Sequence, residues 1–323
     1  MNLNLLIDNI TNPALLFFIL GILAVKLKSD LAIPDSSSKF ISLYLLFAIG
    51  FKGGQELAHS DFNFQVSGAI IFGILLSAIV PLYVFFLVKK RLGTENAGAV
   101  AAAYGSISAV TFVTAVSYLE ILDISFGGHM VATMAFMEAP AIIVGMFLIK
   151  QYSVESTTVK TKQVLHHALT NSSVLLILGS LVIGFLASEE HARGIEPFTT
   201  DIFKGFLAVF LLDMGIQSGR KLSDFFKTGF SNLYLAIGLP FVNGTLTALI
   251  SSFFIDSLGD RFLLSILAAS ASYIAVPAAM RVVAPKSNPG IYLPMALAIT
   301  FPINISLGFP IYMYILKLVA STS

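Results

Sequence analysis

Two stretches of this chain place small hydroxyl side chains inside apolar runs, where their oxygen atoms can bind an ion. Residues 268–281 read AASASYIAVPAAMR, and residues 101–115 read AAAYGSISAVTFVTA. Unpaired backbone groups are costly inside a bilayer, so a helix interrupted there must pack within protein or line a cavity. The N-terminus of a half-helix offers N–H groups to an anion, and loose carbonyls and hydroxyls suit a small cation such as Na⁺. We therefore predict an ion-binding site where the two stretches meet.

The candidate substrate-binding residues combine hydroxyls with residues that interrupt or narrow a helix. They are Gly105, Ser106, Ser108, Thr111, Ser270, Ser272, Tyr273 and Pro277. Pro277 lacks an N–H and clashes with the preceding turn, so we expect it to interrupt its helix. Any single serine can instead pack helices together or bond back to a carbonyl of the preceding turn. The paired arrangement favours the site.

Few ionisable residues fall within the apolar segments, and each is costly unless it faces protein or water. Glu138, just before Pro140, is expected near the site, where it would bind a cation or accept a proton. The alternative is a carboxyl held by serines as a structural contact. Asp213 is expected near a helix end, and Asn288–Pro289 in a turn.

The elements that must position these residues are membrane-spanning helices. Of the 323 residues, 56% are hydrophobic and only 11% are charged, with a mean hydropathy of +0.87, unlike a soluble globular domain. Ten segments are long enough to approach the length that a spanning helix needs. We predict an all-α polytopic membrane protein with spans near 13–27, 38–51, 64–88, 97–118, 128–149, 172–187, 201–216, 230–255, 262–283 and 291–318.

The distribution of basic residues predicts the orientation. Lys and Arg concentrate in the odd-numbered loops, as in Lys89, Lys90 and Arg91, while the even-numbered loops hold few, such as Lys52 and Arg261. Cytoplasmic loops carry the excess of Lys and Arg. We therefore expect a multi-pass protein of the cell inner (plasma) membrane with both termini outside.

The two halves of the sequence resemble each other. Gly50 aligns with Gly215 at 215−50 = 165, Ser106 with Ser272 at 272−106 = 166, and Pro140 with Pro302 at 302−140 = 162. Halves of residues 1–165 and 166–323 would each hold five helices, so the second would enter the membrane in the opposite orientation. Such inverted repeats, each supplying helices to a core and a gate domain, are typical of secondary transporters. Chance likeness between apolar segments is the alternative.

Several other classes of protein lack support in the sequence. No Gly-rich nucleotide loop, paired aspartates or H-E-x-x-H helix is present, and the five histidines fall in or beside loops, so we expect neither an enzyme nor an ATP-driven pump. No cysteine is available for a thiolate metal site. The net charge of +1 and the absence of a basic face predict no nucleic-acid partner. No cofactor is expected, and Na⁺ would act as a coupling ion.

The motifs IGFKGGQEL (49–57), FMEAPA (136–141) and P.SNP (285–289), with the frame of 268–281, resemble the sodium-dependent bicarbonate permeases first known from cyanobacteria. The likeness runs over nearly the whole chain. It implies ten helices as a five-plus-five inverted repeat, with two interrupted helices crossing at the midplane. It also implies a homotrimer that moves HCO₃⁻ with Na⁺.

Site residues carry over from this resemblance by position. Ser108 and Thr111 match its first hydroxyl motif, Ser270 and Ser272 match its second, and Glu138 stands where the family has Asp. The resemblance thereby gives Ser108, Thr111, Glu138 and Ser270 as candidate Na⁺ ligands. The chain departs from the family's motifs at several positions. In the second motif, Tyr273 stands in place of Asp, Ala275 in place of Ser and Val276 in place of Gly, and in the first motif Ala109–Val110 stands in place of Gly-Ser.

The expected function is therefore secondary transport of a small anion by alternating access, with bicarbonate as the substrate and Na⁺ as the driving ion. Two alternatives remain open: a sodium- or proton-coupled carrier of a small organic anion, favoured by Glu138 and the missing Asp, and a non-transporting membrane sensor. Expected partners are the anion and membrane lipid. The loop at 150–170 is shorter than the family's insertion, so it does not support a regulatory PII-like partner.

Overall fold

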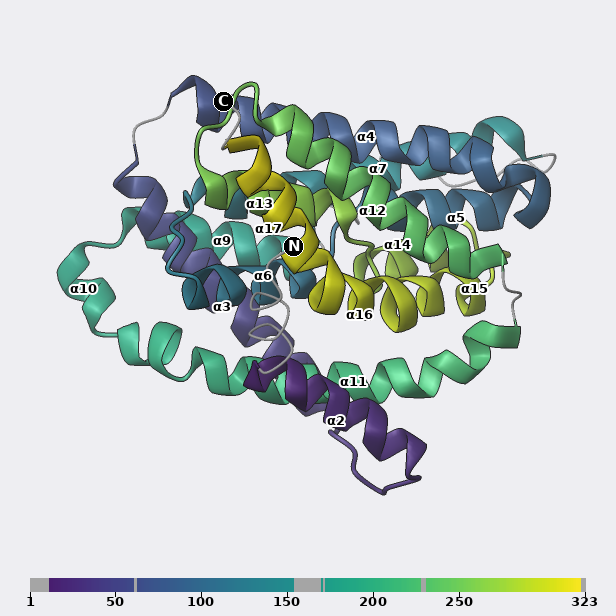
Figure 1. Cartoon of the computed structure of the whole chain (residues 1–323), viewed down its shortest axis with the longest axis horizontal. Helices are drawn as coiled ribbons and strands as arrows, with labels where there is room; N and C mark the ends of the chain where they lie inside the picture. Colours follow the sequence, from purple (N-terminus) through teal and green to yellow (C-terminus); the bar gives the residue numbers. More distant parts are fainter. Residues whose placement is uncertain (1–11, 61–62, 154–169, 171, 228–230, 321–323) are drawn as a thin grey trace.

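The chain folds into helices connected by short segments (Figure 1). The computed structural model describes residues 12–60, 63–153, 170, 172–227 and 231–320, and these ranges contain no strand. The first part of the chain forms α2 (Pro13–Lys26), α3 (Asp35–Ala58), α4 (Phe64–Leu92), α5 (Thr94–Gly105), α6 (Ala109–Ile121) and α7 (His129–Tyr152). The second part forms α9 (Ser172–Leu186), α10 (Glu189–Arg193), η1 (Pro197–Asp201), α11 (Phe203–Lys227), α12 (Ser231–Ser251), α13 (Leu258–Ala269), α14 (Ala275–Val283), α15 (Pro289–Pro294), η2 (Met295–Thr300), α16 (Phe301–Ile303), η3 (Asn304–Gly308) and α17 (Phe309–Ala320).

Six helical segments of the described chain are long and apolar enough to cross a membrane. They are Phe64–Leu92, Thr94–Ile121, His129–Tyr152, Pro197–Leu222, Ser231–Ser251 and Pro289–Ala320. Two shorter apolar helices, Pro13–Lys26 and Ser172–Leu186, lie at two more of the predicted spans. The all-helical architecture predicted from the sequence is therefore confirmed for the described residues, with six candidate membrane spans, and each of the ten predicted spans overlaps a helix.

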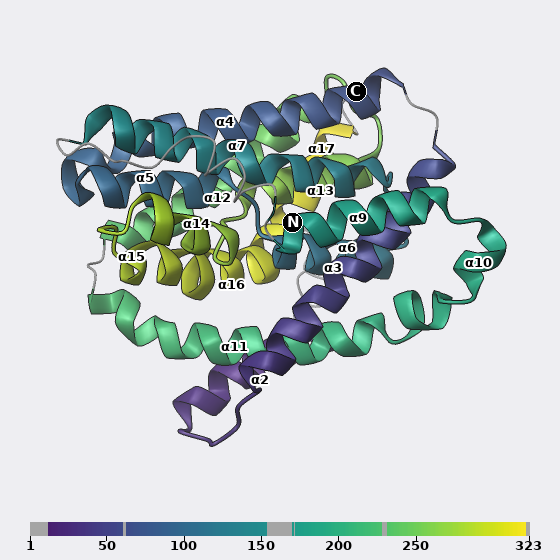
Figure 2. The ribbon, with the colours of Figure 1, turned by 180° about the vertical axis from the view of Figure 1, so that it is seen from behind.

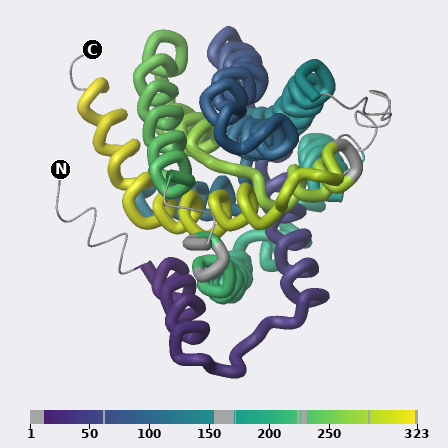
Figure 3. Tube along the Cα trace, turned by 90° about the vertical axis from the view of Figure 1, so that its right-hand side faces the viewer, coloured from purple at the N-terminus to yellow at the C-terminus, as the bar shows by residue number. Residues whose placement is uncertain are grey.

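The helices form two groups. The inner group contains α4 to α7 and α12 to α17, in which α4 packs on α5 and α7, and α12 packs on α13 and α17. The outer group contains α2, α3, α9 and α11, in which α2 packs on α11 and α3 packs on α9. Figure 2 shows α3 beside α9, and Figure 3 shows α11 between α2 and α3 on one side of the molecule. Contacts of α11 with η2 and of α3 with α7 join the two groups.

Glycines allow the outer helices to approach each other closely. A Cβ atom at Gly215 of α11 would lie 2.1 Å from the Phe18 carbonyl oxygen of α2, and one at Gly54 of α3 would lie 2.1 Å from the Leu181 carbonyl oxygen of α9. Small residues at a helix interface permit such backbone contact in membranes, where no hydrophobic effect drives helix association.

Some predicted boundaries were wrong because charged residues have partners in the fold. The sequence placed Lys52 and Arg261 in loops, but Lys52 lies within α3 and Arg261 lies within α13. The Lys52 ammonium pairs with Glu120 at 3.3 Å, and the buried Arg261 guanidinium donates to the Ala248 carbonyl at 3.4 Å. A tertiary partner thus lets a charged residue continue a helix that local hydropathy would end.

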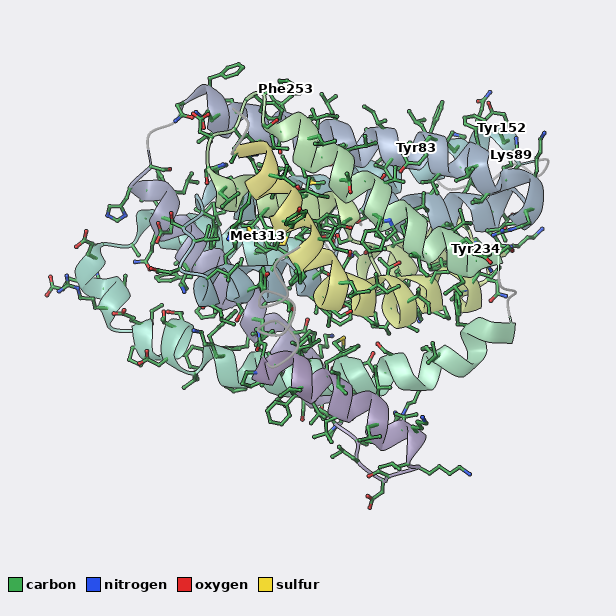
Figure 4. The ribbon with its side chains drawn as sticks, in the orientation of Figure 1. Tyr83, Lys89, Tyr152, Tyr234, Phe253 and Met313 are labelled. Atoms are coloured by element: carbon green, nitrogen blue, oxygen red, sulfur yellow. The ribbon has the colours of Figure 1, made fainter. Side chains whose placement is uncertain are left out.

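One end of α4 shows how the chain leaves the apolar region. The last turn of α4 holds three basic residues and is followed by Gly93 at φ 77°, which accommodates the sharp exit from the helix. Lys89 lies over the ring of Tyr152 at the end of α7, with its Nζ atom 3.5 Å from the ring centroid (Figure 4). This cation–π contact ties the ends of α4 and α7 together.

Candidate functional site

Both stretches singled out in the sequence are breaks between two helices. Helix α5 ends at Gly105 and α6 begins at Ala109, while α13 ends at Ala269 and α14 begins at Ala275. The Ser108 side chain caps α6 by accepting from the Thr111 N–H at 3.2 Å. The paired interruption expected from the sequence is therefore confirmed.

Hydrogen bonds join the two breaks. The Ser108 N–H donates to Ser270 Oγ at 2.9 Å, and the Ser272 N–H donates to the Ala103 carbonyl at 2.8 Å. Ser272 Oγ also accepts from the Val276 N–H in the first turn of α14 at 3.3 Å. Because these serines are buried, they satisfy backbone groups that the broken helices leave open. The two interrupted helices thus meet at one crossing.

A small cavity lies at this crossing, between the inner and outer groups. The start of α6, the segment leading into α14, and residues of α3, α7, α9 and α11 line it. Its polar side chains are Ser42, Ser108, Glu138, Ser173, Ser272 and Tyr273, and the other lining residues are Leu45, Leu46, Ile107, Ala109, Val110, Val113, Phe210, Ile274 and Ala275. The N-termini of both α6 and α14 line the cavity, so positive ends of two helix dipoles act on its contents.

Four residues predicted from the sequence share this cavity: Ser108, Glu138, Ser272 and Tyr273. Sequence reasoning missed Ser42 and Ser173, which come from the outer group. They lie in the first part of α3 and α9, and neither adjoins a proline. No local signal distinguishes such residues from serines that only pack a helix.

Glu138 is 6% exposed and lines the cavity from α7. Within the described ranges, no hydrogen bond or ion pair reaches its carboxyl group. Its backbone carbonyl is 3.5 Å from Ser106 Oγ, which donates to it. A buried charge without a partner is costly, so this carboxyl is suited to exchange a cation or a proton with the cavity. The interpretation of Glu138 as a carboxyl held by serines has no supporting contact in this part of the structure.

Tyr273 stands where related sequences were expected to carry Asp. Its hydroxyl is buried and lies close to the Ser108 side chain. Its ring packs edge-to-face against Phe301, with the centroids 6.0 Å apart. A phenol can both donate and accept a hydrogen bond, so Tyr273 offers the cavity a polar group without a charge.

The other predicted site residues support the crossing without lining the cavity. Ser106, Thr111 and Ser270 are buried at the breaks, and a Cβ atom at Gly105 would lie 2.2 Å from Pro81 Cγ. Pro277 is a correction: it lies in the first turn of α14, after the break, rather than at the interruption itself. The first turn tolerates proline because its N–H groups have no partner within the helix.

Asp213 is a second correction. It lies in the middle of α11, is 4% exposed, and accepts from Ser38 Oγ and from Gln217 Nε2, rather than meeting the interface at a helix end. Asn288 lies in the predicted turn, where its side chain also caps α15 by accepting from the Gly290 N–H at 2.9 Å. Both polar residues find partners that hydropathy alone does not reveal.

A second, larger cavity is lined by residues further along α3 and α6. Its lining includes Lys52, Glu56, Glu120 and Asp123. Glu120 of α6 pairs with Lys52 of α3 at 3.3 Å and with Lys204 of α11 at 3.6 Å. These ion pairs connect the inner group to the outer group on the predicted external side.

No group of three or more His, Cys, Asp or Glu residues within the described ranges is arranged to hold a metal ion. Of the candidate Na⁺ ligands, Glu138 and Ser108 line the cavity, and Ser270 and Thr111 are joined to Ser108 by hydrogen bonds. Ser270 Oγ already accepts from the Ser108 N–H and donates to the Leu267 carbonyl. The cavity offers hydroxyl and carboxyl oxygens together with the N-termini of α6 and α14.

Comparison with known proteins identifies a matching family. The sequence model of the Na⁺-dependent bicarbonate transporter superfamily matches residues 13–317, which include both helix breaks and all the lining residues of the cavity. The search of curated proteins found no match.

Proposed function

Because the chain belongs to the Na⁺-dependent bicarbonate transporter superfamily, we propose that it carries a small anion, bicarbonate, across the membrane together with Na⁺. One observation carries the proposal: the N-termini of two interrupted helices line one cavity between two helix groups. Two helix N-termini favour an anion, and the adjacent hydroxyls and Glu138 offer oxygen ligands for Na⁺.

The proposed mechanism uses a five-plus-five inverted repeat of residues 1–165 and 166–323. Its support comes from equivalent contacts in the two halves. Gly54 of α3 approaches α9, and Gly219, which is 219−54 = 165 residues later on α11, approaches α2. Similarly, α5 and α13 end at Gly105 and Ala269, which are 269−105 = 164 residues apart. The inner group would act as the core domain and the outer group as the gate domain, with their relative movement opening the cavity to each side in turn.

The decisive experiment measures uptake of labelled bicarbonate by proteoliposomes that contain the purified protein. Uptake is compared with and without an inward Na⁺ gradient at several pH values. We expect uptake that depends on the Na⁺ gradient. If correctly inserted protein gives no uptake under either condition, bicarbonate is not the substrate, and the measurement is repeated with small organic anions.

Variants at the crossing test whether the cavity is the transport site. Ser272→Leu places a branched side chain where Ser272 lines the cavity, and Ser106→Leu fills the space at the other break. Both should abolish uptake while membrane insertion persists. Ser252→Leu, at an exposed serine beyond α12, is the matched control. Uptake at the wild-type rate in both crossing variants would remove this cavity from the transport path.

The unpaired carboxyl of Glu138 favours a second candidate, a proton-coupled carrier of a small organic anion. A carboxyl inside the transport cavity can carry a proton across with the substrate. Glu138→Gln keeps the shape of the side chain and removes its charge. If Glu138 takes part in coupling, the pH or Na⁺ dependence of uptake should change in this variant, whereas an unchanged dependence would assign the carboxyl a structural role.

A further inference from the structure

The last transmembrane segment is irregular next to the helix crossing. Two π-helical stretches, η2 (Met295–Thr300) and η3 (Asn304–Gly308), flank the short helix α16. A π-helical turn is rare, and it releases backbone carbonyls from the usual α-helical ladder. Thr300 is the last residue of η2 and Asn304 is the first residue of η3, and both side chains are buried.

Asn304 holds the end of α13. Its Nδ2 atom donates to the carbonyl of Ala269, the last residue of α13, at 2.8 Å. The carbonyl can only accept, so the amide NH₂ group must face it. Carbonyls in the last turn of a helix have no partner within that helix. Asn304 therefore closes the half-helix immediately before the break at 270–274.

Thr300 contacts the end of α5 through the side chain of Tyr104. Its hydroxyl donates to the Ala236 carbonyl of α12 at 2.7 Å, so its single proton is used. The Tyr104 hydroxyl, 2.8 Å from Thr300 Oγ1, must then donate to it. Tyr104 is the residue before Gly105, where α5 ends.

The two held positions are equivalent in the two halves of the chain. Ala269 follows Tyr104 by 269−104 = 165 residues, the same interval that relates Gly50 to Gly215. The segment also bonds to the outer group, because Ser218 of α11 donates to the Leu297 carbonyl of η2 at 2.9 Å. One irregular segment thus contacts both broken helices and α11 of the outer group.

We propose that Thr300 and Asn304 are positioning residues, which fix the ends of α5 and α13 so that the following breaks present Ser108 and Ser272 to the cavity. Neither residue lines the cavity, so they act through the crossing rather than on the anion. The inference deepens the proposed transport function and rests on it.

The test uses a thiol reporter, since the chain has no cysteine. Ala275→Cys places one thiol at the start of α14, where Ala275 lines the cavity. Its rate of reaction with a small water-soluble maleimide is measured alone and with Asn304→Ala. The matched control is Ser306→Ala, in the same π-helical stretch, whose hydroxyl donates to the Pro302 carbonyl of its own segment. This readout needs no transported substrate, so it decides the positioning role even if bicarbonate proves not to be the substrate.

We expect Asn304→Ala to change the labelling rate of Ala275→Cys by about tenfold, as the loss of a buried hydrogen bond implies, and Ser306→Ala to leave it unchanged. In the cysteine-free protein, Asn304→Ala should also raise the KM of uptake. Equal labelling rates in the Asn304→Ala and Ser306→Ala backgrounds would overturn the proposal for Asn304. So would a lower melting temperature with unchanged labelling and KM, because that is the result of a purely structural role.

A double-mutant cycle tests Thr300. Tyr104→Phe removes only the hydroxyl that donates to Thr300, and Thr300→Val removes the hydroxyl that accepts it. Thr300→Ser keeps that hydroxyl and should restore the wild-type KM. If Thr300 positions α5 through Tyr104, the rise in KM of the double variant Tyr104→Phe/Thr300→Val will not exceed that of Thr300→Val alone. Independent, multiplicative effects of the two substitutions would overturn the assignment.

Discussion

The contact between Ser270 and Ser108 allows the strength of the crossing to be measured directly. Ser270 Oγ accepts from the Ser108 N–H at 2.9 Å and donates to the Leu267 carbonyl at 2.9 Å. In Ser270→Ala, the Leu267 carbonyl keeps the Ser270 backbone N–H as a partner, at 3.3 Å. The Ser108 N–H, in contrast, loses its acceptor in a site that is 4% exposed.

An unsatisfied buried donor costs about 1–3 kcal/mol. If local opening at the break requires that much less free energy, the Ser108 amide will exchange its hydrogen about five- to 150-fold faster. The assay is hydrogen–deuterium exchange followed by mass spectrometry on the peptide that contains Ser108. The exchange rate of the rest of α5 and α6 provides an internal reference.

Ser265→Ala is the matched control for Ser270→Ala. Ser265 lies on α13, which ends directly before Ser270, is equally buried, and its hydroxyl donates to the Arg261 carbonyl one turn earlier at 2.7 Å. Removing it leaves no backbone group without a partner, because that carbonyl retains its helical N–H. If the Ser108 peptide exchanges equally fast in both variants, the Ser270 contact does not hold the two breaks together, and the reasoning is refuted.

Three further outcomes are expected elsewhere in the molecule. Gly215→Leu should separate α2 from α11 and reduce the fraction of monodisperse protein after heating, because its Cβ atom would lie 2.1 Å from the Phe18 carbonyl oxygen. Gly205→Leu on the same helix meets open space and should be tolerated. Equal losses of monodisperse protein in the two variants would contradict the close packing of α2 on α11. The pKa of His59 is raised by the Gln55 carbonyl and by Glu189. The contribution of this contact to stability is therefore full below the unfolded pKa of His59 and disappears as pH rises through the folded pKa. In an NMR titration, Glu189→Gln should lower the pKa of His59, and an unchanged value would exclude the contact in solution. An epitope tag at either terminus should be accessible on intact cells, and a need for permeabilisation would reverse the predicted orientation.

Much of the fold could be predicted because hydropathy and helix breakers are local properties. Each of the ten predicted spans overlaps a helix, and both interruptions were located from clusters of small residues and hydroxyls. Pro277 was expected at the second interruption, but it lies in the first turn of α14, which begins at Ala275 directly after the break. Proline fits the first turn as readily as it ends a helix, and only the tertiary contacts of Ser270 and Ser272 decide between these positions.

The candidate site was predicted only where its residues adjoin a break. Ser108, Ser272 and Tyr273 carry that local signal, and Glu138 was conspicuous as a charge in an apolar run. Asp213 gave the same signal but has hydrogen-bond partners in Ser38 and Gln217, away from the cavity. The sequence shows that a polar residue in the membrane needs a partner, but it does not show which partner it has.

The sequence by itself determined that this is a helical membrane protein and which helices are interrupted, because chain length, hydropathy and backbone chemistry in lipid are sufficient for those conclusions. Only the tertiary structure decided that the two breaks bond to each other, that α3, α9 and α11 complete the cavity, and that Thr300 and Asn304 hold the broken ends. Those contacts join residues far apart in the chain. They depend on how helices pack across a few ångströms, which no local pattern of residues encodes.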